Sequence, residues 1–216
     1  MLYHIGKGLS WLAAKLIGRT QVIGRENIPR QGGVILSPNH SSYADPPLVG
    51  VASPRPVWFM AKSELFQIPV LGPMIRRVHA FPVKRGVADR QALRQAHQLL
   101  TAGHAVTIFF EGGRSRDGKL MPPELGVSMI ALRAGVPIVP IAIIDADHFM
   151  PREGGVKFAR VKIIVGEPIS VDHLAGKHAD RAALAEISHI LATRVADMMR
   201  AHGGADRVPA DYPPQV

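Results

Sequence analysis

The chain has 216 residues, enough for one large domain with a sizeable core, and it contains no cysteine. Disulfides, thiolate metal sites and cysteine nucleophiles are therefore excluded. The 26 Lys and Arg residues outnumber the 17 Asp and Glu residues, which gives a formal net charge of +9. Such a balance favours an anionic partner, whether a phosphorylated metabolite, an anionic membrane surface or nucleic acid.

Residues 1–18 are predicted to form an amphipathic helix. Its apolar residues recur at helical spacing: Leu2, Ile5, Leu9, Leu12, Ala13, Leu16 and Ile17. Lys7 and Lys15 lie on the other side, and the segment is shorter than the roughly 20 apolar residues that a membrane-spanning helix needs. No small-residue cleavage site of a secretory signal follows it. Two interpretations remain: a first helix packed on the core, or an interfacial helix lying in a membrane surface.

The remainder of the chain alternates short apolar runs with helical patterns. The predicted strands are residues 34–36, 57–60, 81–83, 105–110, 138–144 and 161–165. The predicted helices are residues 45–51, 89–102, 124–134 and about 180–202. This alternation predicts a layered α/β fold, with a single domain over residues 1–203. Residues 204–216 contain prolines and few apolar side chains, so we expect a loosely ordered tail there.

A histidine and a carboxylate stand five positions apart just after the first of these strands. Asn39 and His40 follow the strand directly, and Asp45, followed by two prolines, stands where a helix can begin. Such a turn can fold the carboxylate back on the imidazole, fixing one tautomer through Nδ1–H and leaving Nε2 free to take a proton. The pair is therefore a candidate general base with its orienting carboxylate. The alternative is a surface histidine with Asp45 as a helix N-cap.

A glycine-rich loop follows the predicted strand 105–110. It carries Glu111 and Arg114 on either side of Gly112 and Gly113, so its backbone can approach a ligand closely. The planar donor fork of Arg114 suits a phosphate. The loop is thus a candidate phosphate site, and its alternative is a solvated polar turn.

Other patterns carry less weight. The strand 81–83 runs into basic residues, but for Arg85 a plain surface charge is an equally good interpretation. Residues 113–119 nearly match a phosphate-binding P-loop, yet Leu120 stands where Ser or Thr should hold magnesium. There is no Gly-x-Ser-x-Gly nucleophile motif. A metal site made of one histidine and two carboxylates would be a thin ligand set for zinc, so we expect no metal.

Taken in order, four motifs resemble those of the glycerolipid acyltransferase family, typified by 1-acylglycerol-3-phosphate acyltransferases. They are Asn39-His40-x4-Asp45, Phe81 to Arg85, Phe109-Phe110-Glu111-Gly112-Gly113-Arg114-Ser115 and Val136-Pro137-Ile138-Val139-Pro140. The chain departs from the family pattern at Lys84, Phe110 and Gly113, where an acidic residue, a proline and a threonine are usual. The resemblance covers residues 33–145 and implies a mixed central sheet flanked by helices.

The resemblance also implies a reaction, the direct transfer of a fatty acyl group from acyl-CoA, or an acyl-carrier protein, to the hydroxyl of 1-acylglycerol-3-phosphate. The product is phosphatidic acid, and no cofactor beyond the acyl donor is implied. In that interpretation His40 is the general base, Asp45 orients it, and the catalysis needs no acyl-enzyme. The residues implied to bind the acceptor phosphate are Arg85 and Arg114. The residues implied to position the substrate are Asn39, Glu111, Gly112, Gly113 and Ser115.

A lipid substrate would place the protein peripherally on the cytoplasmic side of the cell membrane, with residues 1–18 on an anionic surface. Nucleic acid is not an expected partner, because aromatic residues make up only 6% of the chain and no nucleic-acid-binding motif is visible. The apolar stretch 65–75 is a candidate wall of an acyl groove, or else an ordinary core element. Two alternatives stay open: the same chemistry on glycerol-3-phosphate or another lyso- or glycolipid, and a non-catalytic lipid- or nucleic-acid-binding protein.

Overall fold

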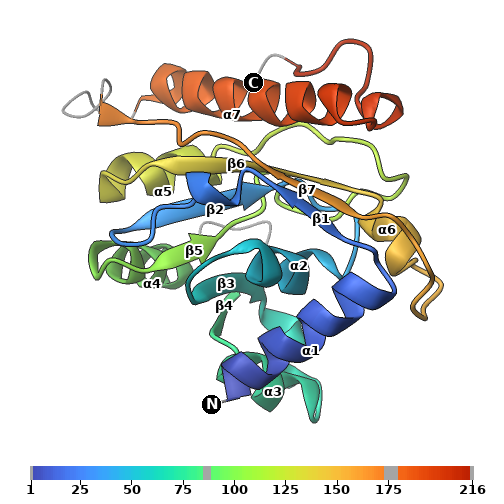
Figure 1. Cartoon of the computed structure of the whole chain (residues 1–216). Coiled ribbons are helices and arrows are strands. Elements are labelled where there is room, and N and C mark those ends of the chain that lie inside the picture. The colour runs from blue at the N-terminus through green and yellow to red at the C-terminus, as the bar shows by residue number, and fades with distance from the viewer. Residues whose placement is uncertain (1, 85–88, 173–179, 215–216) are drawn as a thin grey trace.

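The computed structural model describes residues 2–84, 89–172 and 180–214. Strands form a seven-stranded sheet in the order β1-β7-β6-β2-β5-β3-β4 (Figure 1). They are β1 (Gln21–Ile23), β2 (Val34–Pro38), β3 (Val57–Lys62), β4 (Ala80–Val83), β5 (Ala105–Thr107), β6 (Ile138–Ile144) and β7 (Lys162–Val165). Neighbouring strands pair in parallel except β6 and β7, which are antiparallel. The predicted mixed sheet is therefore confirmed.

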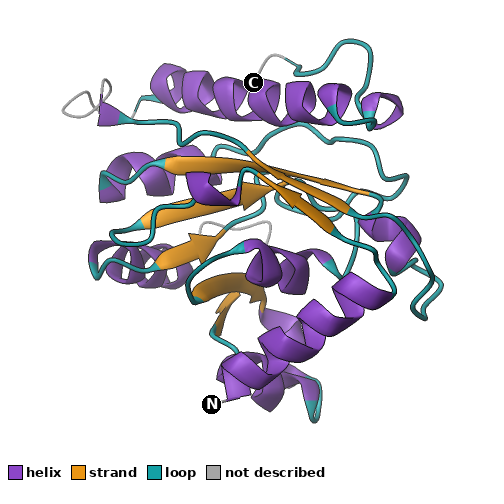
Figure 2. Cartoon of the chain, viewed as in Figure 1, coloured by secondary structure: helices purple, strands orange, loops and turns teal. Residues whose placement is uncertain are grey.

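Helices cover both faces of this sheet (Figure 2). They are α1 (Leu2–Leu16), α2 (Asp45–Ala52), α3 (Leu71–Arg77), α4 (Arg90–Thr101), α5 (Gly126–Ala134), α6 (Ala146–Phe149) and α7 (Arg181–Ala201). The short 3₁₀ helices η1 (Arg25–Asn27) and η2 (Ser63–Gln67) lie in connections, and η4 (Ala205–Arg207) follows α7. Helices α1, α2 and α6 contribute to the core on one face, and α4, α5 and α7 build the core on the other.

The central strand β2 explains why two core layers form. Val34 and Leu36 pack with α1 and α2, whereas Ile35 between them packs with α4, α5 and α7. All three side chains are completely buried. A strand covered on both faces has no solvent side, so it reads as a continuous apolar run rather than as an alternating one.

Helix α1 turns an apolar stripe away from the core. Five of its apolar side chains are about half exposed or more: Ile5 (48%), Leu9 (64%), Trp11 (48%), Leu12 (47%) and Leu16 (61%). The opposite side attaches the helix to the protein, because the backbone N–H of Val57 donates to the Tyr3 hydroxyl at 3.0 Å. The predicted helix is therefore confirmed, but this stripe does not pack on the core. Within the described part of the chain, no helix is long and apolar enough to cross a membrane.

Two segments differ from the sequence-based expectation. Strand β1 has three residues and too short an apolar run for the pattern to indicate it, yet it pairs with β7 at the edge of the sheet. Residues 65–75 run from η2 through a short connection into α3, and this stretch is not a core element. Ile68, Val70 and Met74 are 46%, 82% and 53% exposed.

The C-terminal segment 204–214 is packed, which corrects the expectation of a loosely ordered tail. The guanidinium of Arg207 is buried and donates to the carboxylates of Asp145 and Asp147 at 2.7–2.9 Å. Tyr212 is also buried, and its hydroxyl donates to the carbonyl of Met121 at 3.0 Å. Charge-assisted hydrogen bonds thus order a segment that has few apolar side chains. The packed chain continues beyond residue 203 to Pro214.

Candidate active site

The two chemical motifs meet because they leave neighbouring strands at the same end. Strands β2 and β5 pair in parallel, with Leu36 opposite Thr107. The His40 segment follows β2 and the Glu111 loop follows β5, so both stand at the carboxyl edge of the sheet. Open α/β sheets bind their ligands at this edge. His40 and Glu111 are 71 residues apart in the sequence, yet they lie within hydrogen-bond distance of each other.

His40 and Asp45 are in contact, as the sequence predicts. Nδ1 of His40 lies 2.7 Å from Oδ2 of Asp45, and the two side chains are 11% and 0% exposed. A carboxylate can only accept, so Nδ1 carries the hydrogen and Nε2 is the nitrogen left to take a proton. The same Oδ2 accepts the backbone N–H groups of Ser41 and Ser42 at 2.8 and 2.7 Å. Asp45, the first residue of α2, therefore locks the turn that carries His40.

Glu111 ties the glycine-rich loop to the histidine segment. Its Oε2 accepts the backbone N–H of His40 at 2.8 Å, and its Oε1 accepts the N–H of Met121 at 3.0 Å. Burial, followed by the negative charge of Asp45, raises the pKa of this carboxyl to about 8, although both hydrogen bonds act to lower it. Both carboxyl oxygens of Glu111 thus accept backbone N–H groups. Glu111 contacts His40 through the main chain of His40 and not through its ring.

Asn39 and Ser115 have hydrogen-bond partners within the protein, and their role in positioning the substrate stays a prediction. The Asn39 side chain donates to the carbonyl of Ile143 at 3.0 Å and accepts its N–H at 2.7 Å. The N–H of Ser115 donates to the carbonyl of His40 at 2.8 Å, and its hydroxyl donates to Asp117. Both residues are buried. They hold the backbone around His40, with β6 on one side and the glycine-rich loop on the other.

Gly112 and Gly113 form a tight turn with their own backbone groups. The N–H of Gly112 donates to the carbonyl of Phe109 at 3.2 Å, and that of Gly113 donates to the carbonyl of Glu111 at 2.7 Å. Gly112 has φ +65°, and a Cβ there would stand 2.8 Å from a carbon of the Glu124 side chain. These two N–H groups serve the turn. The absence of a side chain at Gly112 lets the loop pack close to Glu124.

Two aromatic side chains complete the site, and the sequence pattern predicts a role for neither of them. The ring of Phe109 stacks on the imidazole of His40, with centroids 4.0 Å apart and planes 23° apart. The guanidinium carbon of Arg114 lies 3.6 Å from the ring centroid of Tyr43. The signal was present, because both aromatic residues fall inside the two motifs, but stacking partners follow only from the three-dimensional arrangement.

Arg114 keeps free donor capacity next to the His40 segment. Its Nε and Nη1 are buried and have no hydrogen-bond partner among the described residues. Buried guanidinium donors are normally satisfied, so an anion is the partner that suits them. Arg85, the other predicted phosphate ligand, lies outside the described residues.

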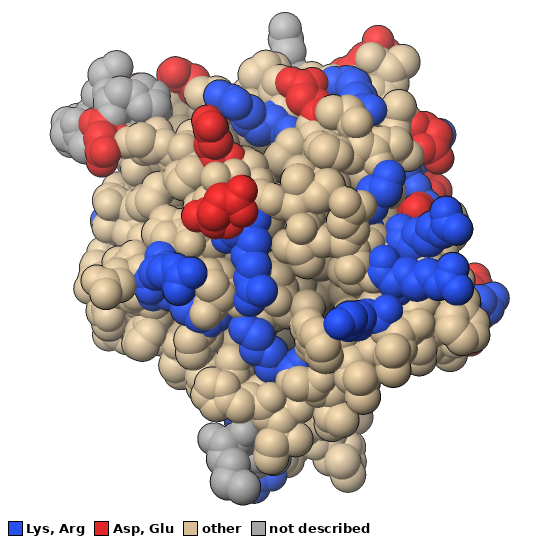
Figure 3. All heavy atoms as spheres, viewed as in Figure 1, with Lys and Arg blue, Asp and Glu red and all other residues tan. Residues whose placement is uncertain are grey.

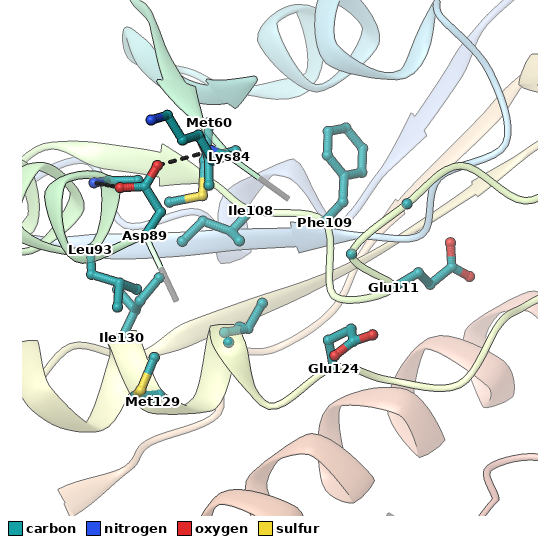
Figure 4. A pocket seen from close by; sticks show the side chains of 16 residues that line it. Met60, Lys84, Asp89, Leu93, Ile108, Phe109, Glu111, Glu124, Met129 and Ile130 are labelled. Atoms are coloured by element: carbon teal, nitrogen blue, oxygen red, sulfur yellow. Dashed lines mark hydrogen bonds between the residues drawn. The ribbon is translucent and has the colours of Figure 1, made fainter. Parts of the chain in front are cut away.

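A cavity of about 670 Å³ lies next to Glu111 and Phe109. Figure 4 shows these two residues and Glu124 toward one end, with mostly apolar side chains toward the other. Besides Phe109, the labelled apolar residues of its wall are Met60, Leu93, Ile108, Met129 and Ile130. The cavity is therefore lined by β3, β4, α4, α5 and the loop that follows β5, and not by the stretch 65–75 that the sequence suggested.

A second cavity of about 590 Å³ adjoins the histidine segment at Ser41. Its wall carries four exposed cations: Arg116, Arg152, Lys157 and Arg160. Figure 3 shows Lys and Arg side chains gathered on the side of the molecule where α6 and the end of α1 lie. The wall also carries three carboxylates, Asp117, Asp147 and Glu153, and Asp147 is paired with Arg207. Because cations are in excess, this cavity is called the basic cavity, in contrast to the apolar one.

The acidic cluster at the edge of the second cavity is already neutralised. Asp145, Asp147 and His148 bring one ligand atom each to within 4.8 Å of one another, a spacing that suits a metal ion. Arg207 donates to both carboxylates there and lies 3.3 Å from His148 Nε2. The cation of this cluster is thus the guanidinium of the C-terminal segment.

The comparison with known proteins agrees with this architecture. A model of the Acyltransferase family matches residues 19–144, which is more than half of the chain. The chain therefore belongs to the acyltransferase family. The resemblance to its 1-acylglycerol-3-phosphate acyltransferases is confirmed by relatives that carry this name.

Two of these relatives are bacterial. The 1-acyl-sn-glycerol-3-phosphate acyltransferase of Bacillus subtilis is 32% identical over 157 residues, covering 71% of this chain and 75% of that protein. The enzyme of the same name from Pseudomonas aeruginosa is 30% identical over 161 residues, covering 72% of this chain and 62% of that protein. The crystal structure of the 1-acyl-sn-glycerophosphate (LPA) acyltransferase PlsC from Thermotoga maritima has a TM-score of 0.71 and 29% identity. The matched region covers 93% of this chain and 78% of the Thermotoga maritima chain.

Proposed function

We propose that the protein transfers a fatty acyl group from a thioester donor to the free hydroxyl of 1-acylglycerol-3-phosphate, which makes phosphatidic acid for phospholipid biosynthesis. The observation that carries the proposal is the buried His40–Asp45 contact of 2.7 Å at the carboxyl edge of the sheet. Arg114, with unpartnered donors, stands on the loop that is hydrogen-bonded to the backbone of His40. The names of the bacterial relatives support the choice of reaction and acceptor.

In the proposed mechanism His40 is the general base. Its Nε2 takes the proton of the acceptor hydroxyl while the oxygen attacks the thioester carbonyl carbon. The new C–O bond forms, the C–S bond breaks as the tetrahedral intermediate collapses, and the leaving thiolate takes the proton back from the imidazolium. Asp45 stabilises that imidazolium and holds the ring in place through Nδ1–H. General-base catalysis of this kind contributes about 10²–10⁴ in rate.

The acceptor phosphate is assigned to Arg114. Its two unpartnered nitrogens form part of a planar fork that matches two phosphate oxygens. The ring of Tyr43 fixes the plane of the guanidinium, so little freedom is lost when the phosphate binds. The family resemblance adds Arg85 as a second phosphate ligand.

The acyl chain is assigned to the apolar cavity beside Phe109. A volume of about 670 Å³ lies in the usual range of small-molecule sites, and its wall is mostly aliphatic. The donor is acyl-CoA in this proposal. An acyl-carrier protein presents the same thioester to His40, and no metal or further cofactor takes part in either case.

The protein is proposed to work at a membrane surface, on the cytoplasmic side of the cell membrane. The support is the outward stripe of α1, where Leu9 and Leu16 are 64% and 61% exposed. A helix with one apolar side facing outward and basic residues beside it has the character of an interfacial helix. An anionic surface suits the net charge of +9.

A substrate panel tests the reaction. Thiol release from acyl-CoA and from acyl-carrier protein is followed with 1-acylglycerol-3-phosphate, glycerol-3-phosphate and other lysophospholipids, and the products are identified by mass. We expect phosphatidic acid as the main product, formed with acyl-CoA. Faster turnover of glycerol-3-phosphate, or of a lysophospholipid without a terminal phosphate, would contradict the proposed acceptor.

A further inference from the structure

The segment between α6 and β7 has a surface that the fold itself does not use. We propose that residues 151–160, here called the basic loop, form a second contact with an anionic lipid bilayer, next to α1. This inference rests on the proposed function only in that α1 lies on the same membrane. The basic loop is a membrane contact outside the helix. A bilayer bound there would place the basic cavity next to the lipid phosphates.

The first observation is exposed apolar surface at the tip of the loop. Phe158 is 79% exposed and Val156 is 48% exposed. Gly154 and Gly155 precede them with φ of +100° and +81°, a left-handed conformation that turns the chain sharply. An exposed aromatic side chain at such a tip gains nothing from the protein core. Its burial in the acyl boundary of a bilayer would remove that apolar area from water.

The second observation is the attachment of the loop to α1. The N–H of Ala159 donates to the carbonyl of Ile17 at 3.2 Å, and that of Val161 donates to the carbonyl of Gly18 at 2.9 Å. The other end is held where the N–H of Lys157 donates to the carbonyl of Phe149 at 2.9 Å. Figure 1 shows the loop after α6 beside the C-terminal end of α1. Phe158 is thereby fixed near the end of the helix whose exposed stripe finishes at Leu16.

The third observation is the charge around these apolar side chains. The basic loop carries Arg152, Lys157 and Arg160, all exposed, against one carboxylate, Glu153. The end of α1 adds the exposed Lys15 and Arg19. Apolar side chains surrounded by cations match a bilayer with anionic head groups, where each basic residue near the surface strengthens binding. A soluble phosphate would use the cations but would leave Phe158 and Val156 in water.

The position of the loop has a consequence for the substrate. Lys157, Phe158 and Arg160 form part of the wall of the basic cavity, and Ser41 forms another part, directly after His40 in the chain. A bilayer resting on the loop therefore brings its phosphates to the cavity that adjoins the histidine. A lysophospholipid could then reach the site from the interface instead of crossing water.

A fluorescent label tests the contact directly, because the chain contains no cysteine of its own. Val156→Cys is labelled with the polarity-sensitive fluorophore NBD, and Arg194→Cys, on the exposed side of α7, is labelled as the control. Vesicles of phosphatidylcholine and phosphatidylglycerol in equal parts should raise and blue-shift the emission at position 156 alone. Inorganic phosphate without vesicles should leave it unchanged, and the same response to phosphate would assign the surface to a soluble anion and overturn the proposal.

Sedimentation with the same vesicles measures the strength of the contact. Removing two surface cations costs about fivefold each in partitioning, so Lys157→Ala with Arg160→Ala should weaken binding about 25-fold. The matched control, Arg94→Ala with Arg194→Ala, should leave it within about twofold. Vesicle binding with an unchanged NBD spectrum at position 156 would overturn the loop contact but leave α1 and the proposed reaction intact. Absence of vesicle binding in the wild type would overturn the loop contact and the α1 contact together.

Discussion

Replacing Glu111 by glutamine should change how the stability of the protein depends on pH. The folded protein raises the pKa of this carboxyl from 4.5 to about 8, chiefly by burial. Between those two values the folded state binds more protons than the unfolded chain does. The free energy of unfolding therefore falls as the pH rises through this window, and the loss is complete only above the folded pKa.

The magnitude follows from the size of the shift. Each pKa unit corresponds to about 1.4 kcal/mol, so the shift from 4.5 to about 8 sets a ceiling of roughly 4–5 kcal/mol. We expect about half of that ceiling, because buried sites relax and admit water. Glutamine does not titrate, but its amide nitrogen is a donor and cannot accept one of the two backbone N–H groups that Glu111 binds. That loss costs about 1–3 kcal/mol.

The variant should therefore be less stable than the wild type at pH 5, and the gap should narrow or reverse by pH 8.5. Urea denaturation at several pH values gives the free energy of unfolding for both proteins, and their difference cancels the titration of groups that they share. Glu124→Gln, an exposed glutamate of the same cavity, is the control and should follow the wild type. A difference between wild type and Glu111→Gln that stays constant across this range would refute the reasoning.

Three further predictions concern the acceptor, the C-terminal segment and the cavity. Arg114→Lys keeps the charge but loses the planar fork over Tyr43. The KM for the acceptor should therefore rise about tenfold or more while the KM for the acyl donor stays unchanged. Equal changes in both KM values would count against a phosphate-binding role. Tyr212→Phe removes the hydrogen bond to Met121 and should lower the free energy of unfolding by about 1 kcal/mol in urea, whereas an unchanged value would mean that the contact adds nothing. Met129→Trp narrows the apolar cavity and should shift the products toward shorter acyl chains by mass; an unchanged chain-length profile would place the acyl chain elsewhere.

The fold was largely predictable because buried strands and local helices leave strong patterns. Strands such as β2 and β6 are continuous apolar runs, since helices cover them on both faces. Which side of α1 faces the protein was not predictable in this way. Periodicity defines the stripe that contains Leu9 and Leu16, but only tertiary contacts such as that of Tyr3 with Val57 decide which side faces the protein.

The candidate site was predictable where its contacts are local. His40 and Asp45 are five residues apart, so the turn between them can be inferred from the sequence. The partner of Asn39 lies 104 residues away, and pairing with Ile143 depends on the strand order and register, which no sequence pattern reveals. The packing of the C-terminal segment could not be predicted for the same reason. The carboxylates that Arg207 binds lie about sixty residues earlier in the chain.

The most direct test of the proposed chemistry is thiol release from acyl-CoA by purified His40→Ala, with 1-acylglycerol-3-phosphate as the acceptor and thermal unfolding as the check on folding. If Nε2 of His40 is the base that Asp45 orients, the rate should fall by about 10²–10⁴ while the folded protein persists. A folded variant that releases thiol at nearly the wild-type rate would contradict the account.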